Sequence, residues 1–352
     1  MTVPAGRLPD GFVVRLDPRV RRRADGALLG GSPLRLMRLS ARAQGLLDDG
    51  RLVVRDATGA ELAGRLLDAG LAAPDLGTAP PADVTVVIPV RDRPAGLARL
   101  LTALRADPAT AALPVVVVDD GSRDPVPATD GVRLVRHPTA RGPAAARNAG
   151  LRAAGTPFVA FLDSDCVPVA GWLERLMPHL ADPRLAVVAP RIVALPDGER
   201  TWLTAYEAAV SALDMGPWPA SVRALSAVSY VPSAALLARR AALGDGFDQS
   251  MRVAEDVDLV WRLTGAGWRV RYEPAALVAH QHPARTADWL RRRAFYGTGA
   301  ALLAARHVGD RRQCPGHGAV AGIRPRAVGG LLRAERRAAG PTGGAGGRLR
   351  PV

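Results

Sequence analysis

Two carboxylates one residue apart, Asp163 and Asp165, stand directly after the apolar run Phe158–Leu162. An extended segment that leaves a sheet there would place both acids at its carboxyl edge, where open α/β sheets bind their ligands. Oxygen ligands at such an edge suit a divalent metal ion that holds a phosphate. The same D-x-D pattern is common in solvated turns, so the pair by itself leaves both interpretations open.

Two earlier apolar runs also end in polar residues. The first contains Pro89 and leads to Arg91, and the second, Val115–Val118, leads to Asp120. Since the carboxyl ends of parallel strands share one edge of a sheet, we expect all three strand ends to lie together. A capped turn is the competing interpretation of the sequence Asp-Asp-Gly-Ser, and the order of the three strand ends favours a site.

A glycine-containing loop, residues 141–150, lies between the second and third of these strands and leads into a helix. An exposed helix start with arginine nearby is a ready anion site. Arg141, Arg147 and Asn148 are therefore candidates for a binding pocket, although the last two would also suit an ordinary helix face.

Acidic and imidazole side chains gather again further along the chain. Glu255, Asp256 and Asp258 open a predicted helix, and His280 and His282 follow a predicted strand. Acids at a helix start are also favoured by the helix dipole, and a lone histidine is more often structural. The residue types alone leave the roles of these five side chains open.

The elements that must position these residues alternate between strand and helix from Val84 onwards. This alternation favours a parallel sheet covered on both faces. The predicted strands are Val84–Val90, Val115–Val118, Val132–Val135, Phe158–Leu162, Leu185–Val188, Trp268–Tyr272 and Ala276–Ala279; the predicted helices are residues 97–104, Ala144–Ala154, Trp172–Leu180, Glu255–Gly265 and Asp288–Ala305.

Residues 1–75 are predicted to form a small winged-helix-like α+β unit, and residues 76–83, rich in Pro and Ala, a linker. Apolar periodicity and helix-capping residues support these assignments. The predicted strands are Phe12–Leu16 and Arg51–Val54, and the predicted helices are Ala41–Leu47 and Glu61–Ala69.

The 352-residue chain has a net charge of +14, and all of its basic residues are arginine. This bias fits a GC-rich coding sequence, and no aromatic-interleaved basic patch accompanies it, so we expect no nucleic-acid partner. Residues 306–352 are rich in Gly, Arg and Ala without periodicity, which predicts disorder. A frameshifted or engineered end would give the same mixture.

Two cysteines, Cys166 and Cys314, cannot form a disulfide framework. No apolar run approaches the length that crosses a bilayer, and the N-terminus lacks a signal-peptide core. We therefore expect a cytoplasmic protein, with peripheral contact to the inner face of the cell membrane.

In their order and spacing these motifs resemble the family 2 inverting glycosyltransferases with the GT-A fold, over about residues 84–305. The resemblance implies a Rossmann-like mixed sheet that binds a nucleotide sugar. Pro89 and Arg91 would then lie against the base, Asp120 would accept a hydrogen bond from uracil, and Asp163 would lie near the ribose. Arg141, Arg147 and Asn148 would belong to the same nucleotide-sugar pocket.

The resemblance also assigns the chemistry. Inverting transfer needs a base that takes the proton from the acceptor hydroxyl; Asp256 matches that base, with Glu255 as the alternative and Asp258 holding the helix. Asp165 and His280 match the ligands of a divalent metal ion, Mn²⁺ or Mg²⁺. The metal would neutralise charge on the departing diphosphate.

Residues 291–297, Arg-Arg-Arg-Ala-Phe-Tyr-Gly, stand where processive relatives carry a Q-x-x-R-W motif. That motif is absent, which argues against synthesis of a long polymer through a membrane channel. The arginines would meet the diphosphate or the acceptor, or form a solvated helix face.

The N-terminal unit resembles small PqqD-related peptide-recognition domains, through Leu29–Ser40 and the two following helices. Joined to a family 2 domain, it is similar to the glycosyltransferases of the mycofactocin system. That resemblance implies transfer of glucose from UDP-glucose onto a peptide-derived redox cofactor, building a short β-linked oligoglucoside. The alternatives are a rhamnosyl- or galactofuranosyltransferase of cell-envelope polysaccharide and, in another class, a peptide-binding module with an inactive transferase domain.

Overall fold

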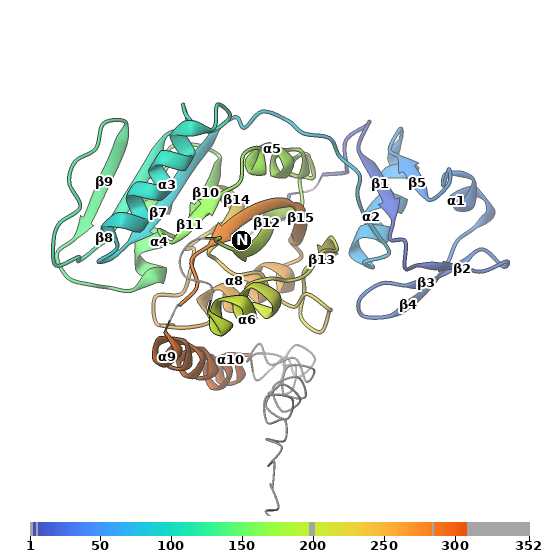
Figure 1. Cartoon of the computed structure of the whole chain (residues 1–352). Helices are drawn as coiled ribbons and strands as arrows, with labels where there is room; N and C mark the ends of the chain where they lie inside the picture. Colours follow the sequence, from blue (N-terminus) through green and yellow to red (C-terminus); the bar gives the residue numbers. More distant parts are fainter. Residues whose placement is uncertain (1–2, 5, 197–200, 284, 308–352) are drawn as a thin grey trace, which may run out of the picture.

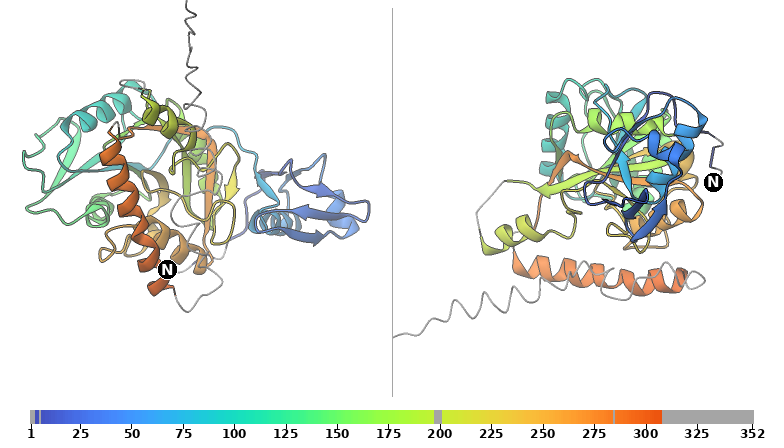
Figure 2. Two further views of the ribbon diagram at one scale, coloured as in Figure 1. Left: turned by 60° about the horizontal axis from the view of Figure 1, so that its bottom comes forward. Right: turned by 90° about the vertical axis from the view of Figure 1, so that its right-hand side faces the viewer.

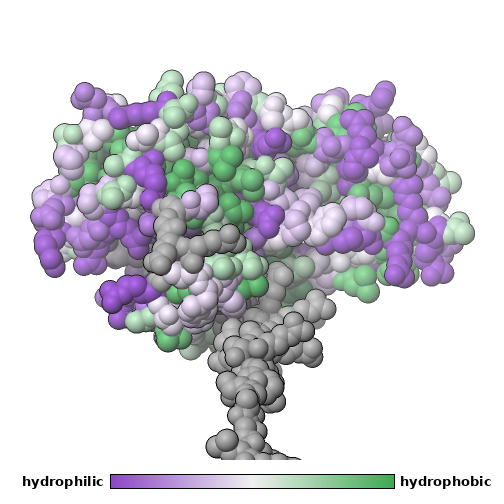
Figure 3. Space-filling view, in the orientation of Figure 1, coloured by the Kyte–Doolittle hydropathy of each residue, from purple (hydrophilic) through white to green (hydrophobic). Residues whose placement is uncertain are grey.

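The computed structural model describes residues 3–4, 6–196, 201–283 and 285–307. Residues 308–352, which hold Cys314 and most of the tail predicted to be disordered, lie outside the described residues. A small N-terminal unit and a larger α/β domain are joined by an extended segment (Figure 1). Hydrophilic side chains gather over this unit and over the opposite end of the larger domain (Figure 3).

A mixed sheet forms the centre of the larger domain. Its strands are β7 (Val84–Val90), β8 (Val115–Asp120), β9 (Val132–His137), β10 (Phe158–Leu162), β11 (Cys166–Pro168), β12 (Leu185–Ala194), β13 (Ala220–Ser221), β14 (Ala235–Arg239) and β15 (Arg269–His280). Their order is β11-β15-β12-β14-β10-β7-β8-β9, with β13 beside β15. Strands β7 to β10 are parallel, whereas β14 runs antiparallel to both β10 and β12. The predicted mixed α/β fold is confirmed.

Helices cover both faces of this sheet because alternate side chains of its apolar strands point to opposite sides. On one face, Val87 and Phe161 pack with α4 and α8. On the other, Ile88 and Leu162 pack with α3 and α5. The helices are α3 (Pro94–Ala106), α4 (Pro143–Ala153), α5 (Trp172–Leu176), which continues as a 3₁₀ turn over Met177–Ala181, α6 (Trp202–Val210), α7 (Arg240–Leu243), α8 (Glu255–Gly265), α9 (Thr286–Gly297) and α10 (Gly299–Arg306).

The segments after β12 differ most from the sequence-based prediction. Strand β14 was not predicted, and β15 is one strand where two were expected. The register of β15 against β12 jumps from Glu273 to Leu277, which absorbs the irregular residues between the two predicted halves. The predicted long helix divides at Thr298 into α9 and α10, which lie nearly end to end (Figure 2).

The N-terminal unit has its own apolar core. Ser40 and Asp56 cap its two helices by accepting hydrogen bonds from backbone N–H groups, as expected for these residue types. The second helix starts a turn earlier than predicted, and strands β2, β3, β4 and β6 were not predicted. The elements are β1 (Val13–Leu16), β2 (Arg21–Arg22), β3 (Ala27–Gly30), β4 (Arg35–Arg38), α1 (Ala41–Gly45), β5 (Arg51–Val53), α2 (Ala57–Asp68) and β6 (Ala72–Pro74).

Acids and arginines join this unit to the larger domain. Arg269 of β15 donates to both Asp68 oxygens at 2.7 and 3.0 Å and to Asp182 at 3.0 Å. Arg271 donates to the same Asp182 at 2.5 Å. We call Asp68, Asp182, Arg269 and Arg271 the junction network.

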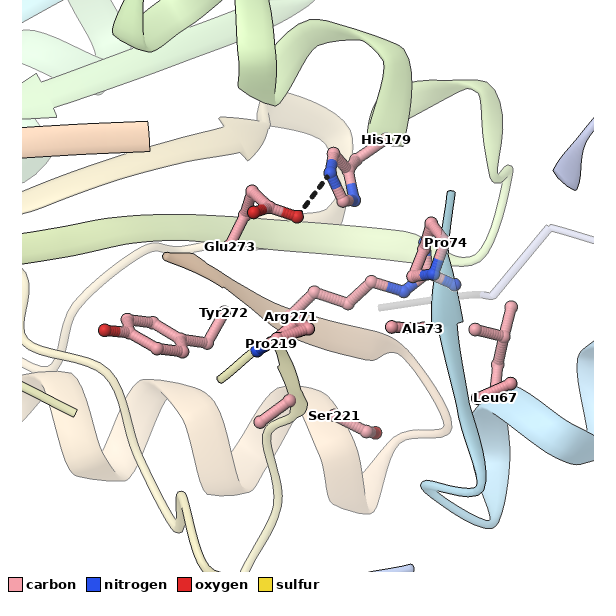
Figure 4. Close-up of a pocket in the computed structure, with 11 residues that line it drawn as sticks. Leu67, Ala73, Pro74, His179, Pro219, Ser221, Arg271, Tyr272 and Glu273 are labelled. Atoms are coloured by element: carbon pink, nitrogen blue, oxygen red, sulfur yellow. Dashed lines mark ion pairs between the residues drawn. The ribbon is translucent and has the colours of Figure 1, made fainter. Parts of the chain in front are cut away.

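A hollow lies beside the junction network (Figure 4). Leu67 and Pro74 of the N-terminal unit line it together with Arg271 and the ion pair between His179 and Glu273. The hollow holds none of the site residues predicted from the sequence, so the candidate chemistry lies elsewhere in the larger domain.

Candidate active site

The carboxyl ends of β7, β8 and β10 meet at one edge of the sheet, as the sequence predicts. The register pairs Val90 with Asp119 and Val87 with Phe161. Asp119 is fully buried and accepts hydrogen bonds from the backbone of Ser122 and Val126, which fixes the turn after β8.

Asp120 fastens the loop that enters α4. Its Oδ1 accepts hydrogen bonds from His137 Nδ1 at 2.7 Å and from the N–H of Arg141 at 2.9 Å, and its Oδ2 accepts from the N–H of Gly142 at 2.8 Å. A carboxylate oxygen has two acceptor positions, so Oδ2 keeps one for a further donor. Contact with uracil stays a prediction that this geometry permits.

Pro89, Arg91 and Arg141 form the rim next to Asp120. Pro89 is half-buried in β7, while the side chains of Arg91 and Arg141 are exposed. Arg141 reaches Gln249 at 3.3 Å. The exposed Arg141 guanidinium next to the start of α4 suits an anionic ligand, whereas the Arg91 guanidinium lies 3.6 Å from the Asp92 carboxylate.

Asn148 uses both ends of its amide inside the protein. Its Nδ2 donates to the carbonyl of Phe247 at 2.7 Å, and its Oδ1 accepts from the N–H of Phe247 at 2.9 Å. The side chain is buried and ties α4 to the loop before α8. Direct contact between Asn148 and a nucleotide sugar stays a prediction, whereas the structural contact is visible.

Arg147 joins acids from two distant segments. It is buried, donates to Asp163 Oδ1 at 2.6 Å and to Glu255 Oε1 at 3.0 Å, and packs over the ring of Phe247. Burial opposes its charge, but the two carboxylates outweigh burial and raise the pKa of Arg147 above its ordinary value. We call Asp163, Asp165, Glu255 and Asp256 the carboxylate cluster.

Asp256 lies in the first turn of α8 and forms no side-chain ion pair among the described residues. Its Oδ2 accepts a hydrogen bond from the N–H of Ser233 at 3.1 Å, and its Oδ1 accepts from the N–H of Val257 at 2.8 Å. Burial and the neighbouring Glu255 raise the pKa of Asp256 to about 7. A carboxylate with that pKa is suited to accept a proton near neutral pH.

Asp165 and His280 lie side by side at the end of β15. His280 Nε2 is 3.3 Å from Asp165 Oδ1, and Arg93 Nη1 donates to Asp165 Oδ2 at 2.9 Å. Burial would raise the pKa of Asp165, but His280, Arg93 and Arg292 outweigh it and hold that pKa well below its usual range. Asp165 is therefore a permanent anion.

Asp165 and His280 offer two donor atoms to a divalent metal ion. Asp165 Oδ1 and His280 Nε2 converge, while the other ring nitrogen of His280, the buried Nδ1, has no hydrogen-bond partner among the described residues. Within the described ranges, no three His, Cys, Asp or Glu side chains are arranged to hold a metal ion. One carboxylate oxygen and one imidazole nitrogen suit Mn²⁺ better than Mg²⁺, which prefers oxygen ligands, and the ion would take its other ligands from phosphate and water.

Helix α9 brings Arg292 and Tyr296 towards the carboxylate cluster, whose charges act on the Tyr296 hydroxyl. Buried Glu207 of α6 holds this helix: its Oε1 accepts from Trp289 Nε1 at 2.6 Å and from Arg293 Nη2 at 2.9 Å. These side chains line a second hollow next to His282.

The sequence did not single out Arg93 or Glu207. Arg93 lies two residues beyond Arg91, and its position in the strand-end loop was the available signal. Glu207 acts across more than eighty residues of sequence on α9, and no local pattern announces such a contact.

The sequence of this chain is similar to those of known glycosyltransferases. Residues 85–242 match the family model described as Glycosyl transferase family 2. The chain is 55% identical over 313 residues to a pre-mycofactocin glycosyltransferase of Mycobacterium tuberculosis, covering 86% of this chain and 65% of that protein. It thus spans less than two thirds of that relative's length.

Other known proteins are similar over a shorter part of the chain or at a lower sequence identity. The succinoglycan biosynthesis protein ExoU of Rhizobium meliloti is 36% identical over 107 residues, covering 28% of this chain and 31% of that protein. Among solved structures, a mannosyltransferase from Pyrobaculum calidifontis in complex with GDP-Man and Mn²⁺ superposes with a TM-score of 0.48 at 21% identity, covering 76% of this chain and 79% of the other.

Proposed function

We propose that this chain, which carries a family 2 glycosyltransferase domain, transfers a sugar with inversion from a nucleotide donor onto a peptide-derived redox cofactor. Glucose from UDP-glucose is the proposed donor, and a short oligoglucoside on pre-mycofactocin is the proposed product. The similarity to the mycobacterial pre-mycofactocin glycosyltransferase supports the acceptor. The observation that carries the reaction is Asp256, a half-buried carboxylate whose pKa is raised to about 7 by burial and the neighbouring Glu255.

The proposed mechanism follows from the contacts of Asp256. Two backbone N–H groups fix its oxygens, which leaves acceptor positions for a substrate hydroxyl. As the hydroxyl oxygen attacks the anomeric carbon, its proton passes to Asp256 and the bond to the diphosphate breaks. Asp165 and His280 would hold a divalent metal ion, which when bound neutralises diphosphate charge.

The remaining donor contacts are proposed for the strand ends. Pro89, Arg91 and Asp120 would face the base, and Asp163 the ribose. Arg141 would meet the phosphates, because its exposed guanidinium favours anions.

The N-terminal unit is proposed to hold the peptide part of the acceptor, as a PqqD-like domain. Its separate apolar core and its tie to β15 through the junction network support a distinct unit at a fixed place. Peripheral contact with a membrane is proposed for α9 and α10, because Leu290, Phe295 and Leu302 are exposed beside Arg291. No helix in the described part of the chain is long and apolar enough to cross a membrane.

Purified full-length protein tests the proposal when it is incubated with UDP-glucose, Mn²⁺ and the peptide-derived acceptor, with products read by mass spectrometry. Addition of hexose to the acceptor is the expected result. Turnover only with another nucleotide sugar and a polysaccharide acceptor would favour a cell-envelope enzyme, and no turnover of any nucleotide sugar would favour an inactive peptide-binding module.

A further inference from the structure

The carboxylate cluster contains two adjacent acids, Glu255 and Asp256, and either could in principle take a proton. Their surroundings differ. Glu255 is buried and accepts a hydrogen bond from the Arg147 guanidinium at 3.0 Å, whereas the hydrogen bonds of the Asp256 carboxylate within the described residues come from backbone N–H groups. The guanidinium occupies an oxygen of Glu255, whereas each Asp256 oxygen keeps an acceptor position for a substrate hydroxyl.

Arg147 also fixes where these acids lie. Its planar guanidinium binds Glu255 with one nitrogen and Asp163 with another, and the ring of Phe247 supports its face. An arginine fork holds two oxygens at set positions better than the single ammonium of lysine does. The same side chain therefore ties the α8 acids to the end of β10.

The groups that face Asp256 come from four places in the fold. Glu255 precedes it on α8, Arg147 faces it from α4, Tyr230 from the loop before β14, and Tyr296 from α9. Glu255 disfavours the charged form of Asp256 and Arg147 favours it. Burial raises the pKa of Tyr230 to about 12, so this phenol stays neutral.

We propose, building on the proposed function, that Arg147 is a positioning residue that assigns different roles to the two adjacent acids. By holding Glu255 in an ion pair it keeps that acid out of proton transfer, and it leaves Asp256 as the group that receives the proton. In the transfer step the acceptor O–H bond breaks towards an Asp256 oxygen. The new bond joins the acceptor oxygen to the anomeric carbon, and the electron pair of the broken glycosidic bond leaves with the diphosphate.

The test compares Glu255→Gln, Arg147→Gln and Arg147→Lys with the unmodified full-length chain. Two readouts are used: the pH dependence of kcat for transfer from UDP-glucose, and ¹³C NMR titration of labelled aspartate side-chain carboxyls. Asp256→Asn identifies the resonance of Asp256. Arg262→Gln is the matched control, because Arg262 pairs with buried Asp258 on the same helix at 2.7 Å.

Removing the charge of Glu255 should move the acid limb of the rate profile and the Asp256 titration to lower pH by about one unit, because one raising charge is lost. Arg147→Gln should move both to higher pH by a similar amount and lower kcat. Arg147→Lys should reverse part of the upward pH shift that Arg147→Gln causes. Arg262→Gln should lower the melting temperature. It should leave the acid limb of the rate profile and the Asp256 titration at the pH values of the unmodified chain.

Unchanged titration of Asp256 in both Glu255→Gln and Arg147→Gln would overturn the inference, as would an equal shift in Arg262→Gln. Arg147→Lys keeps the test decisive where Arg147→Gln does not fold: a kcat and a pH profile equal to those of the unmodified chain would overturn the positioning role of the arginine fork. A wild-type protein that transfers no sugar would defeat the proposed function instead, while the NMR titration would still judge the role of Arg147.

Discussion

The carboxylate cluster and the junction network are built from the same residue types, and they differ in how many arginines their acids meet. In the junction network, Asp68 and Asp182 face Arg269 and Arg271. Burial would raise the pKa of Asp182, but Arg271 and Arg269 outweigh it, so that pKa is lowered. Every acid there stays charged.

The carboxylate cluster has more acids than buried cations. Arg147 serves Asp163 and Glu255, and Arg93 serves Asp165, which leaves Asp256 without an ion pair among the described residues. Burial and Glu255 then raise the pKa of Asp256 to about 7. Paired charges hold two parts of the fold together in the junction network, whereas in the carboxylate cluster an acid without an ion pair has a raised pKa, as expected for the proposed proton acceptor.

Asp256→Asn should give the largest effect on activity. The amide keeps the shape of the side chain but cannot take a proton, so kcat should fall by about 10²–10⁴-fold. The affinity for UDP-sugar, measured by calorimetry, should stay the same. Equal loss of donor binding would make Asp256 a binding residue and would remove the contrast with the junction network.

Asp182→Ala should act on stability instead of chemistry. It leaves Arg271 and part of Arg269 buried without a counter-charge, so the free energy of unfolding should fall by about 3–5 kcal/mol. Denaturant titration measures the loss, and kcat per folded molecule should change little. A large fall in kcat of the folded fraction would contradict the separation of the two regions.

Asp165→Ala should lower metal-dependent transfer by on the order of 100-fold or more, because one of the two proposed protein ligands is lost. The fold should persist, as judged by circular dichroism. The measurement is the rate at increasing Mn²⁺ concentration. Full activity with an unchanged Mn²⁺ dependence would refute the metal assignment.

The pH dependences of kcat and of the unfolding free energy should distinguish the carboxylate cluster from the junction network. Asp256 must be deprotonated to act, so below its pKa of about 7 kcat should fall about tenfold per pH unit. The lowered pKa of Asp182 means that its stabilising contribution is present above the unfolded-state pKa and is lost only as pH falls through the folded-state value. Between pH 5 and 8 the rate should therefore change while this contribution to unfolding free energy stays constant. Parallel changes would contradict the comparison.

The sequence predicted the elements whose pattern is local. Strand β10 (Phe158–Leu162) and helix α8 (Glu255–Gly265) have the predicted bounds, because an uninterrupted apolar run and a strong helical period leave few alternatives. The position of Asp120 and Asp163 at one edge of the sheet follows from the parallel pairing of β8 and β10 with β7. These are the parts of the site that short-range pattern determines.

The rest depends on contacts between distant segments. Strand β14 (Ala235–Arg239) is a short run that ends in arginine, and its antiparallel place between β10 and β12 is set by tertiary pairing. Arg147 meets Glu255 across 108 residues of sequence. In the proposed mechanism this contact distinguishes Glu255 from Asp256, and a contact between such distant residues cannot be predicted from residue type.

Strand β15 begins at Arg269 in the junction network and ends at His280 in the candidate metal pair. At about 3.3 Å per residue it spans roughly 35 Å. In the proposed function, a peptide held at the N-terminal unit would have to bridge a distance on that scale to bring its modified end to the candidate metal pair. The length of β15 would then set how far from the recognised segment a sugar is added.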